Sequence, residues 1–146
     1  MKYIVDANIA IKWVIPESDS DDALALLGHG LLAPELLLPE CLNVLWHKRV
    51  KQELDEAESD VALTALAAAP IQWLPVAPMM KTVLDLAVRL KHPAYDCTYL
   101  AAAIHVGVPM VTADGKFVRR LRRDDAVADL APHVRLLGEP LESFNH

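Results

Sequence analysis

Short apolar segments alternate along this chain with longer stretches of helical periodicity, and this alternation constrains the fold more than any other feature. Parallel strands need long crossovers, which helices usually supply, and strands covered by helices on both faces are apolar throughout. We therefore expect an α/β fold in which a central parallel sheet of five strands is flanked by helices. The expected strands are residues 2–5, 31–33, 71–74, 109–112 and 134–137.

The segments between these strands have amphipathic or apolar helical patterns that end near proline or glycine. No linker, repeat or low-complexity tract divides the chain, so we expect a single domain over residues 1–146. Five glycines are present, but none of them forms G-x-G-x-x-G or G-x-x-x-x-G-K-[ST], which excludes the dinucleotide-binding and P-loop classes. The expected helices are residues 7–14, 34–51, 54–69, 79–90, 95–106 and 116–123, with another beginning near residue 23.

The composition favours a cytoplasmic protein with no membrane partner. Hydrophobic residues make up 53% of the chain, yet no apolar run approaches the roughly 18 residues that a membrane-spanning helix needs. The N-terminal segment contains Lys2 and Asp6 and has no apolar core of the kind found in secretory signals. The net charge of −6 does not exclude a nucleic-acid partner, because the local field governs binding. The positive mean hydropathy indicates an apolar surface that a partner or a second copy covers.

The cysteines and histidines do not indicate a disulfide framework or a zinc site. Cys41 and Cys97 are expected to be buried thiols in a reducing compartment. Each directly follows an acidic residue, so a disulfide between them stays open as the less favoured alternative. The six histidines show neither H-E-x-x-H nor a Cys/His spacing typical of zinc, which argues against structural zinc.

Four acidic residues stand where a parallel α/β fold builds its ligand sites. Asp6 follows the first expected strand and Asp114 follows the fourth, and the carboxyl ends of parallel strands form the crevice in which ligands bind. Glu40 and Asp96 fall in the first turns of expected helices, where the helix dipole favours an ionised carboxylate. The neighbours of Glu40 in sequence are nearly all apolar, which is unusual for an acid that is merely solvated.

Simpler roles stay open for each acid taken alone. Asp6, Asp96 and Asp114 have the residue type preferred at helix N-caps, and for Glu40 the alternative is a pair with one basic group. Four acids at one end of a sheet are poorly explained by four independent caps, because clustered carboxylates repel one another unless a cation neutralises them. We therefore expect a hard, oxygen-seeking ion such as Mg²⁺ or Mn²⁺ at this edge.

At these positions the sequence resembles the PIN-domain family, and within it the VapC-like toxins of bacterial and archaeal toxin–antitoxin pairs. The resemblance rests on four blocks in the family's order, which are VDAN at residues 5–8, PECLNVL at 39–45, YDCTYLA at 95–101 and TADGKF at 112–117. It implies single-stranded RNA as substrate, a homodimer, and a small antitoxin protein as partner. It also implies an acidic quartet of Asp6, Glu40, Asp96 and Asp114, with Asn8 and Thr112 as small polar residues near the metal.

A basic run follows Asp114 in the sequence and is a candidate RNA-binding surface. The alternative is a solvated helix face, because at helical spacing the arginines point in more than one direction. The run consists of Lys116, Arg119, Arg120, Arg122 and Arg123.

The sequence thus predicts a Mg²⁺-dependent endoribonuclease that cleaves a phosphodiester of single-stranded or loop RNA by attack of water. Asp6 and Asp96 are the favoured direct ligands of the ion. The main alternative is a catalytically silent PIN-like module that binds RNA or protein. A dehalogenase-like phosphatase is disfavoured, because that class needs Asp-x-Asp where this chain has Asp6 followed by Ala7 and Asn8. A receiver domain is disfavoured because it needs paired acids after its first strand.

Overall fold

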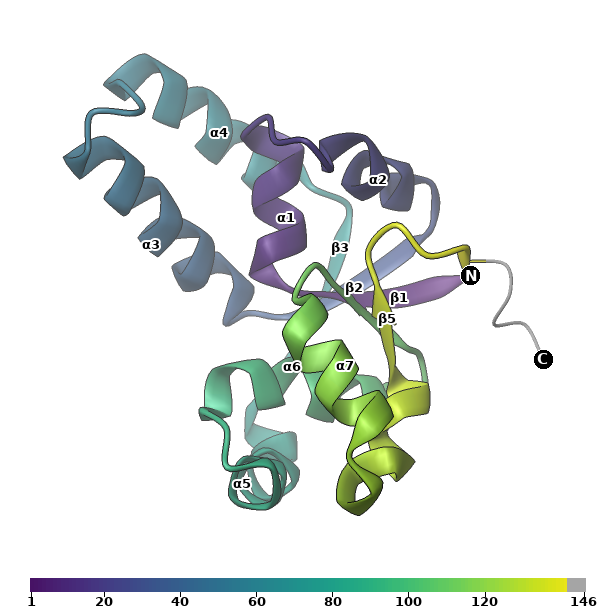
Figure 1. Cartoon of the computed structure of the whole chain (residues 1–146). Coiled ribbons are helices and arrows are strands. Elements are labelled where there is room, and N and C mark those ends of the chain that lie inside the picture. Colours follow the sequence, from purple (N-terminus) through teal and green to yellow (C-terminus); the bar gives the residue numbers. More distant parts are fainter. Residues whose placement is uncertain (142–146) are drawn as a thin grey trace.

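The computed structural model describes residues 1–141 and shows a sheet of five parallel strands between two groups of helices (Figure 1). The strand order is β3-β2-β1-β4-β5, so the first strand of the chain lies in the middle of the sheet. The predicted α/β fold with five parallel strands is confirmed. The strands are β1 (Lys2–Val5), β2 (Gly30–Pro34), β3 (Ile71–Leu74), β4 (Met110–Thr112) and β5 (Val134–Leu136).

The strand order reverses at β1, because β2 and β3 lie on one side of it and β4 and β5 lie on the other. Tyr3 of β1 pairs with Leu31 of β2 on one side, and Val5 pairs with Val111 of β4 on the other. In an open parallel sheet, a crevice forms beyond the carboxyl ends of the two strands at which the order reverses. The residues that follow Val5 and Thr112 are therefore placed by topology at the mouth of this crevice.

Two layers of helices cover the sheet (Figure 1). In the orientation of Figure 1, α1 to α4 lie above the sheet and α5 to α7 lie below it. The helices are α1 (Ala7–Val14), α2 (Ser20–Ala25), α3 (Leu37–Val50), α4 (Glu56–Ala68), α5 (Met80–Leu90), α6 (Ala94–Val106) and α7 (Gly115–Arg123). Short 3-10 helices are η1 (Leu26–Gly28), η2 (Ala77–Met79) and η3 (Asp125–His133).

The core is built on β1 and α6. Tyr3, Ile4 and Val5 are fully buried, as expected for the central strand of a sheet covered on both faces. Helix α6 contacts β1, β2, β4 and α5, and every residue from 97 to 103 is buried. A helix that is apolar all round is stable only when other elements enclose it. Because α6 is fixed in this way, its N-terminal residues have well-defined positions at the edge of the sheet.

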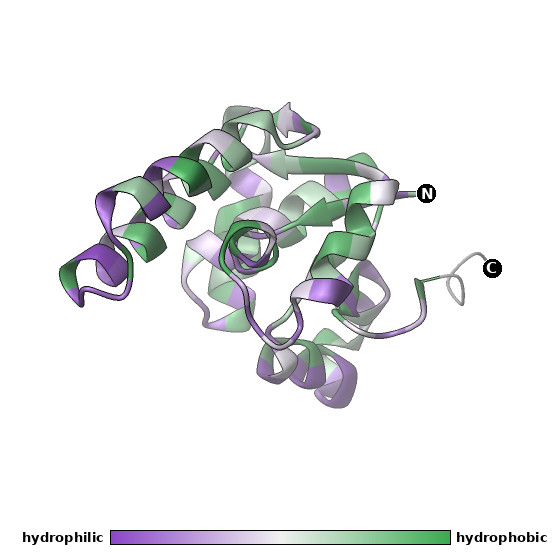
Figure 2. Cartoon of the chain, turned by 90° about the horizontal axis from the view of Figure 1, so that it is seen from above, coloured by the Kyte–Doolittle hydropathy of each residue, from purple (hydrophilic) through white to green (hydrophobic). Residues whose placement is uncertain are grey.

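Helices α3 and α4 form a hairpin that extends away from the sheet (Figure 1). Hydrophobic and hydrophilic stretches alternate along both helices (Figure 2). Leu42, Trp46 and Val50 on α3 are exposed at a spacing of four residues, and Val61 on α4 is exposed as well. Apolar side chains at this spacing lie on one helix face, so the hairpin presents an apolar stripe to solvent.

The structure differs from the sequence prediction at several boundaries. Strand β2 continues to Pro34, and α3 begins only at Leu37 after a turn, because the fixed φ of proline fits an extended strand end. The 3-10 helix η3 is not among the elements that the sequence predicts.

Lys12 on α1 is buried, and its Nζ lies 2.6 Å from Glu17 Oε2 and 3.0 Å from Asp19 Oδ1. Among residues 1–141, no helix combines the length and apolar composition of a membrane span.

We predict that Leu100→Ala lowers the free energy of unfolding by about 2–5 kcal/mol, because the buried leucine of α6 leaves a cavity in the core. The matched control is Val61→Ala on α4, where the side chain is 71% exposed, and its effect is expected within about 0.5 kcal/mol. Urea unfolding followed by circular dichroism measures both values. Equal destabilisation by the two variants would contradict the placement of α6 in the core.

Candidate active site

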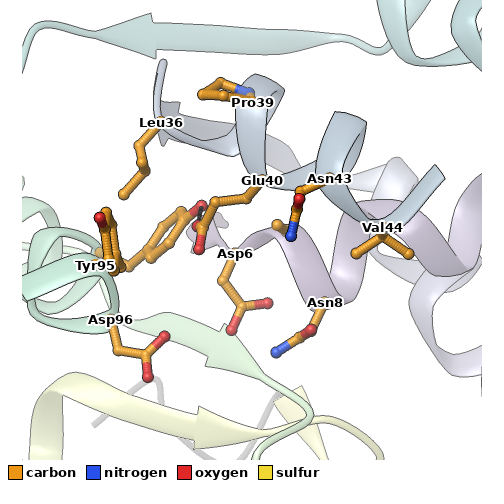
Figure 3. Close-up of a pocket in the computed structure, with 11 residues that line it drawn as sticks. Asp6, Asn8, Leu36, Pro39, Glu40, Asn43, Val44, Tyr95 and Asp96 are labelled. Atoms are coloured by element: carbon orange, nitrogen blue, oxygen red, sulfur yellow. Dashed lines mark hydrogen bonds between the residues drawn. The ribbon is translucent and has the colours of Figure 1, made fainter. Parts of the chain in front are cut away.

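Three of the four acidic residues line one pocket at the carboxyl edge of the sheet (Figure 3). The pocket has a volume of about 490 Å³ and lies between the N-terminal turns of α1, α3 and α6. Asp6 comes from the end of β1, Glu40 from α3 and Asp96 from α6. Figure 3 shows the three carboxylates around a common space, which we call the acidic pocket.

Asp6 has two structural partners and is 5% exposed. Its Oδ1 accepts a hydrogen bond from the backbone N–H of Ile9 at 3.0 Å, which caps α1. Its Oδ2 accepts a hydrogen bond from the Thr112 hydroxyl at 2.6 Å, which joins β1 to β4. Burial raises the pKa of Asp6 to about 6, and the charges of Asp96 and Glu40 add to the rise, although both hydrogen bonds oppose it.

Glu40 lies in the first turn of α3 and is held by a tyrosine from the opposite side of the pocket. The Tyr99 hydroxyl donates to Glu40 Oε1 at 2.5 Å, and the phenol is itself buried. Burial raises the pKa of Glu40 above its ordinary value, the hydrogen bond from Tyr99 lowers it, and repulsion from Asp96 raises it further. Burial and the ionised Glu40 also raise the pKa of Tyr99, which keeps the phenol protonated as a donor.

Asp96 lies in the first turn of α6, four residues after His92. His92 Nε2 and Asp96 Oδ2 are 2.6 Å apart, and the imidazole ring packs against Phe117 with centroids 5.2 Å apart. The preceding N-cap position of α6 is Pro93, so Asp96 does not serve as the helix cap. Its carboxylate is therefore available to the pocket, with one oxygen positioned by the imidazole.

Asp114 does not line the acidic pocket. It caps α7, with Oδ1 accepting from the backbone N–H of Phe117 at 3.1 Å, and it lines a neighbouring hollow of about 450 Å³. The hollow is shared with His92, Lys116, Phe117 and Arg120. Because His92 contacts Asp96, the two cavities meet at the His92–Asp96 pair. The structure thus brings three of the expected acids together and puts the fourth next to them.

Within residues 1–141, no lysine or arginine forms an ion pair with Asp6, Glu40, Asp96 or Asp114. The alternative of a simple ion pair for Glu40 therefore does not apply. The same part of the chain holds no group of three or more His, Cys, Asp or Glu side chains close enough to enclose a metal ion. An open arrangement of carboxylates suits Mg²⁺, which keeps several waters and takes one or two protein carboxylates. The donor set fits such an ion.

The expected supporting residues both lie at the site. Thr112 bonds Asp6, and the exposed Asn8 lines the acidic pocket together with Asn43 (Figure 3). Sequence reasoning missed the roles of Tyr99 and His92. For Tyr99 the available signal was its position three residues after Asp96, because residues at this spacing lie on the same side of a helix. His92 precedes α6, and only its closeness to Asp96 in the sequence could have indicated it.

Four residues of the basic run line a third hollow, of about 400 Å³, beside Asp124. Arg122 departs from the expectation, because its guanidinium pairs with both carboxylate oxygens of Glu139, at 2.9 Å and 2.7 Å. A Cβ at Gly115 would come within 2.8 Å of Arg119 Nη1, so glycine leaves room for this guanidinium over the first turn of α7. We call the remaining four residues the basic surface: Lys116, Arg119, Arg120 and Arg123.

Cys41 and Cys97 are buried free thiols, as expected. The Cys41 thiol points toward the Ala7 carbonyl at 3.8 Å, and the Cys97 thiol toward the His92 carbonyl at 3.9 Å. Burial raises the pKa of Cys41 to about 12 and that of Cys97 to about 11, so both stay protonated.

The fold and the pocket define an α/β protein with an acidic site at the point where the strand order reverses. The sequence matches the model of the PIN domain over residues 3–122, and the chain belongs to the PIN-domain family. It is 25% identical over 117 residues to ribonuclease VapC12 of Mycobacterium tuberculosis, found in two strains, with 80% of this chain and 89% of the relative covered.

Two solved structures share the fold. PAE2754 from Pyrobaculum aerophilum superposes with a TM-score of 0.63 at 21% identity, over 94% of this chain and 84% of that chain. VapBC2 from Rickettsia felis, solved bound to a DNA fragment from the promoter, gives a TM-score of 0.61 at 15% identity over 93% of this chain and 98% of that chain. The resemblance to the VapC-like members of the family is thereby confirmed.

We predict that Asp6→Asn stabilises the metal-free protein at neutral pH. Asp6 has a pKa of about 6 in the folded state, above its ordinary value of 3.8. As the pH rises through this window, the unfolded chain ionises Asp6 more readily than the folded chain does, so the free energy of unfolding falls. Asparagine keeps the N-cap without the charge. The gain in unfolding free energy should therefore grow with pH across this window and reach about 1–3 kcal/mol at pH 7.

Unfolding in urea with EDTA, repeated from acid to neutral pH, measures this difference. The exposed Asp60→Asn on α4 is the control and should show no such growth with pH. A gain from Asp6→Asn that is equal at all pH values would argue against the raised pKa.

Proposed function

We propose that this chain is a metal-dependent endoribonuclease that hydrolyses phosphodiester bonds of single-stranded or loop RNA by attack of water. The observation that carries the proposal is a set of three carboxylates around one pocket, each held by an uncharged donor or an imidazole, with no lysine or arginine paired to them among residues 1–141. Uncompensated negative charge of this kind attracts a divalent cation. The similarity to a ribonuclease supports the same assignment.

The roles of the acidic residues follow from their partners. Asp6 and Asp96 both line the acidic pocket and are proposed as direct ligands, whereas Glu40 and Asp114 would contact the ion through its waters or hold a second ion. A bound Mg²⁺ or Mn²⁺ supplies an activated water and offsets the charge of the transition state. Thr112 and Tyr99 fix the carboxylates they touch, which reduces reorganisation during the reaction. Products with a 5′-phosphate and a 3′-hydroxyl are expected.

The basic surface is proposed to bind RNA phosphates. Lys116 and Arg120 line both the hollow that contains Asp114 and the adjoining hollow with Arg119 and Arg123. These basic side chains therefore extend from the hollow beside the His92–Asp96 pair along α7. Cations near a carboxylate site offset its repulsion of a polyanion, which would otherwise weaken RNA binding.

We further propose that the protein is the toxin of a toxin–antitoxin pair, acts in the cytoplasm and forms a homodimer. The similarity to VapC12 supports the toxin role. The exposed stripe of Leu42, Trp46 and Val50 on α3 supports a protein partner, because an amphipathic antitoxin helix buries a stripe of this kind. A second stripe on α5, formed by Met80, Leu84 and Val88, is available to another copy of the chain.

We predict that purified protein cleaves single-stranded RNA in Mg²⁺ and that EDTA abolishes the activity. Asp96→Asn should lower the cleavage rate at least about 100-fold, since a metal contributes several kcal/mol to such reactions. The control is the exposed Asp60→Asn, which should cleave like the parent chain. Activity that persists in EDTA would exclude the metal role, and clean, folded protein that cleaves no RNA would favour the catalytically silent module.

We predict that Arg120→Ala weakens binding of a single-stranded RNA oligonucleotide and lowers the slope of log affinity against log salt by about 0.7, the value for one lost phosphate contact. Arg89→Ala is the matched control, because Arg89 on α5 is paired with Asp129. Fluorescence anisotropy at several salt concentrations gives the slopes. Equal slopes for the parent chain and Arg120→Ala would remove Arg120 from the RNA-binding surface.

A further inference from the structure

We propose that the apolar side of the acidic pocket is a base-binding slot, in which the Tyr95 ring stacks on a nucleobase of RNA while the attached backbone crosses the carboxylates. This inference rests on the proposed ribonuclease function and adds to it the part of the substrate that the site holds. The slot is formed by Leu36, Pro39 and Tyr95.

The acidic pocket has two chemically different sides (Figure 3). Leu36 and Tyr95 lie on one side, with the Leu36 side chain directed toward the tyrosine, and Asn8 and Asn43 lie on the other. The carboxylates of Glu40 and Asp6 are between them, and the carboxylate of Asp96 lies next to Tyr95. A cavity that held only a hydrated ion would not need an aromatic and aliphatic wall, whereas a nucleotide has an apolar base face and a charged phosphate on one molecule.

Tyr95 has no structural role that explains its exposure. Its side chain is 62% exposed, although tyrosine rings usually pack against other groups. Within residues 1–141, the pairs of rings in contact are Tyr3 with His29, Trp46 with His47 and His92 with Phe117, and Tyr95 belongs to none of these pairs. An exposed aromatic ring at the mouth of a charged cavity is the feature on which single-stranded nucleic acids stack.

The position of Tyr95 in α6 relates the base to the reacting phosphate. Tyr95 and Asp96 are consecutive residues in the first turn of a helix that is fixed by its buried segment. A base on Tyr95 therefore leaves its own phosphate beside Asp96, and the next phosphates can continue toward Lys116 and Arg120 in the adjoining hollow. Leu36 and Pro39 offer no hydrogen-bonding side chain, so the slot accepts a flat apolar surface rather than one particular base.

The test uses RNA binding by the full chain with Asp6→Asn, in Mg²⁺, so that the oligonucleotide is not consumed. Tyr95→Ala in this background should weaken binding of a fluorescein-labelled single-stranded RNA by about tenfold, as expected for one lost stacking contact. Tyr95→Phe should bind within about twofold of the background chain, because the ring is kept. The control is Leu24→Ala on α2, an exposed apolar residue that does not line the pocket, which should have no effect.

A second measurement asks whether the lost affinity belongs to a base. An abasic site is moved along the oligonucleotide, and at one position it should weaken binding of the background chain about tenfold but leave Tyr95→Ala unchanged. Tyr95→Ala binding as tightly as the background chain, or an equal loss with Tyr95→Phe, overturns the slot. A change in molar mass by light scattering on Tyr95→Ala, with RNA affinity unchanged, also overturns it and assigns the surface to a second copy.

Cleavage by the chain with Asp6 intact is measured in parallel and separates the two proposals. Metal-dependent cleavage that is unaffected by Tyr95→Ala refutes the slot and leaves the ribonuclease function standing. Absence of both cleavage and RNA binding refutes both.

Discussion

Negative charge held in place without a lysine or arginine partner among residues 1–141 is the constraint on which the rest of this structure depends. Asp6 is buried between β1 and β4, where its charge is disfavoured by loss of water and by Glu40 and Asp96. The fold keeps these acids close by giving each a specific neighbour: Thr112 for Asp6, Tyr99 for Glu40 and His92 for Asp96. The hydroxyls of Thr112 and Tyr99 orient the carboxylates they touch without neutralising their charge, whereas a guanidinium would do both.

Helix capping and site chemistry are not alternatives for the aspartates at the strand ends. Asp6 and Asp114 each use Oδ1 to receive a backbone N–H and begin a helix. The second oxygen of Asp6 reaches Thr112, whose own Oγ1 accepts the N–H of Asp114. One short chain of hydrogen bonds thus connects the ends of two neighbouring strands. The residues that end the strands are therefore also those that build the site, which ties the pocket's shape to the pairing of β1 with β4.

Much of the fold and the acidic residues could be predicted because they depend on local patterns. Periodicity located β1, α1 and β3 at their observed bounds, and the strand ends indicated Asp6 and Asp114. The partners could not be predicted, because Tyr99 meets Glu40 across 59 positions and Thr112 meets Asp6 across 106. The position of Asp114 in the adjoining hollow could not be predicted for the same reason. Nor could the pairing of Arg122 with Glu139. Side-chain partners of this kind are set by tertiary packing, which no local pattern encodes.

The ion pairs of Lys12 with Glu17 and Asp19 bear on the electrostatic field inside the acidic pocket. Lys12 is the only basic residue of α1, the helix that Asp6 caps, and it lies in the last turn, away from the acidic pocket. Glu17 and Asp19 hold its ammonium at the opposite end of the helix. Helix α1 therefore offers the carboxylates only the partial positive charge of its amide groups. Because Glu17 and Asp19 pair with Lys12, the negative charge of the acidic pocket is left for an external cation to neutralise.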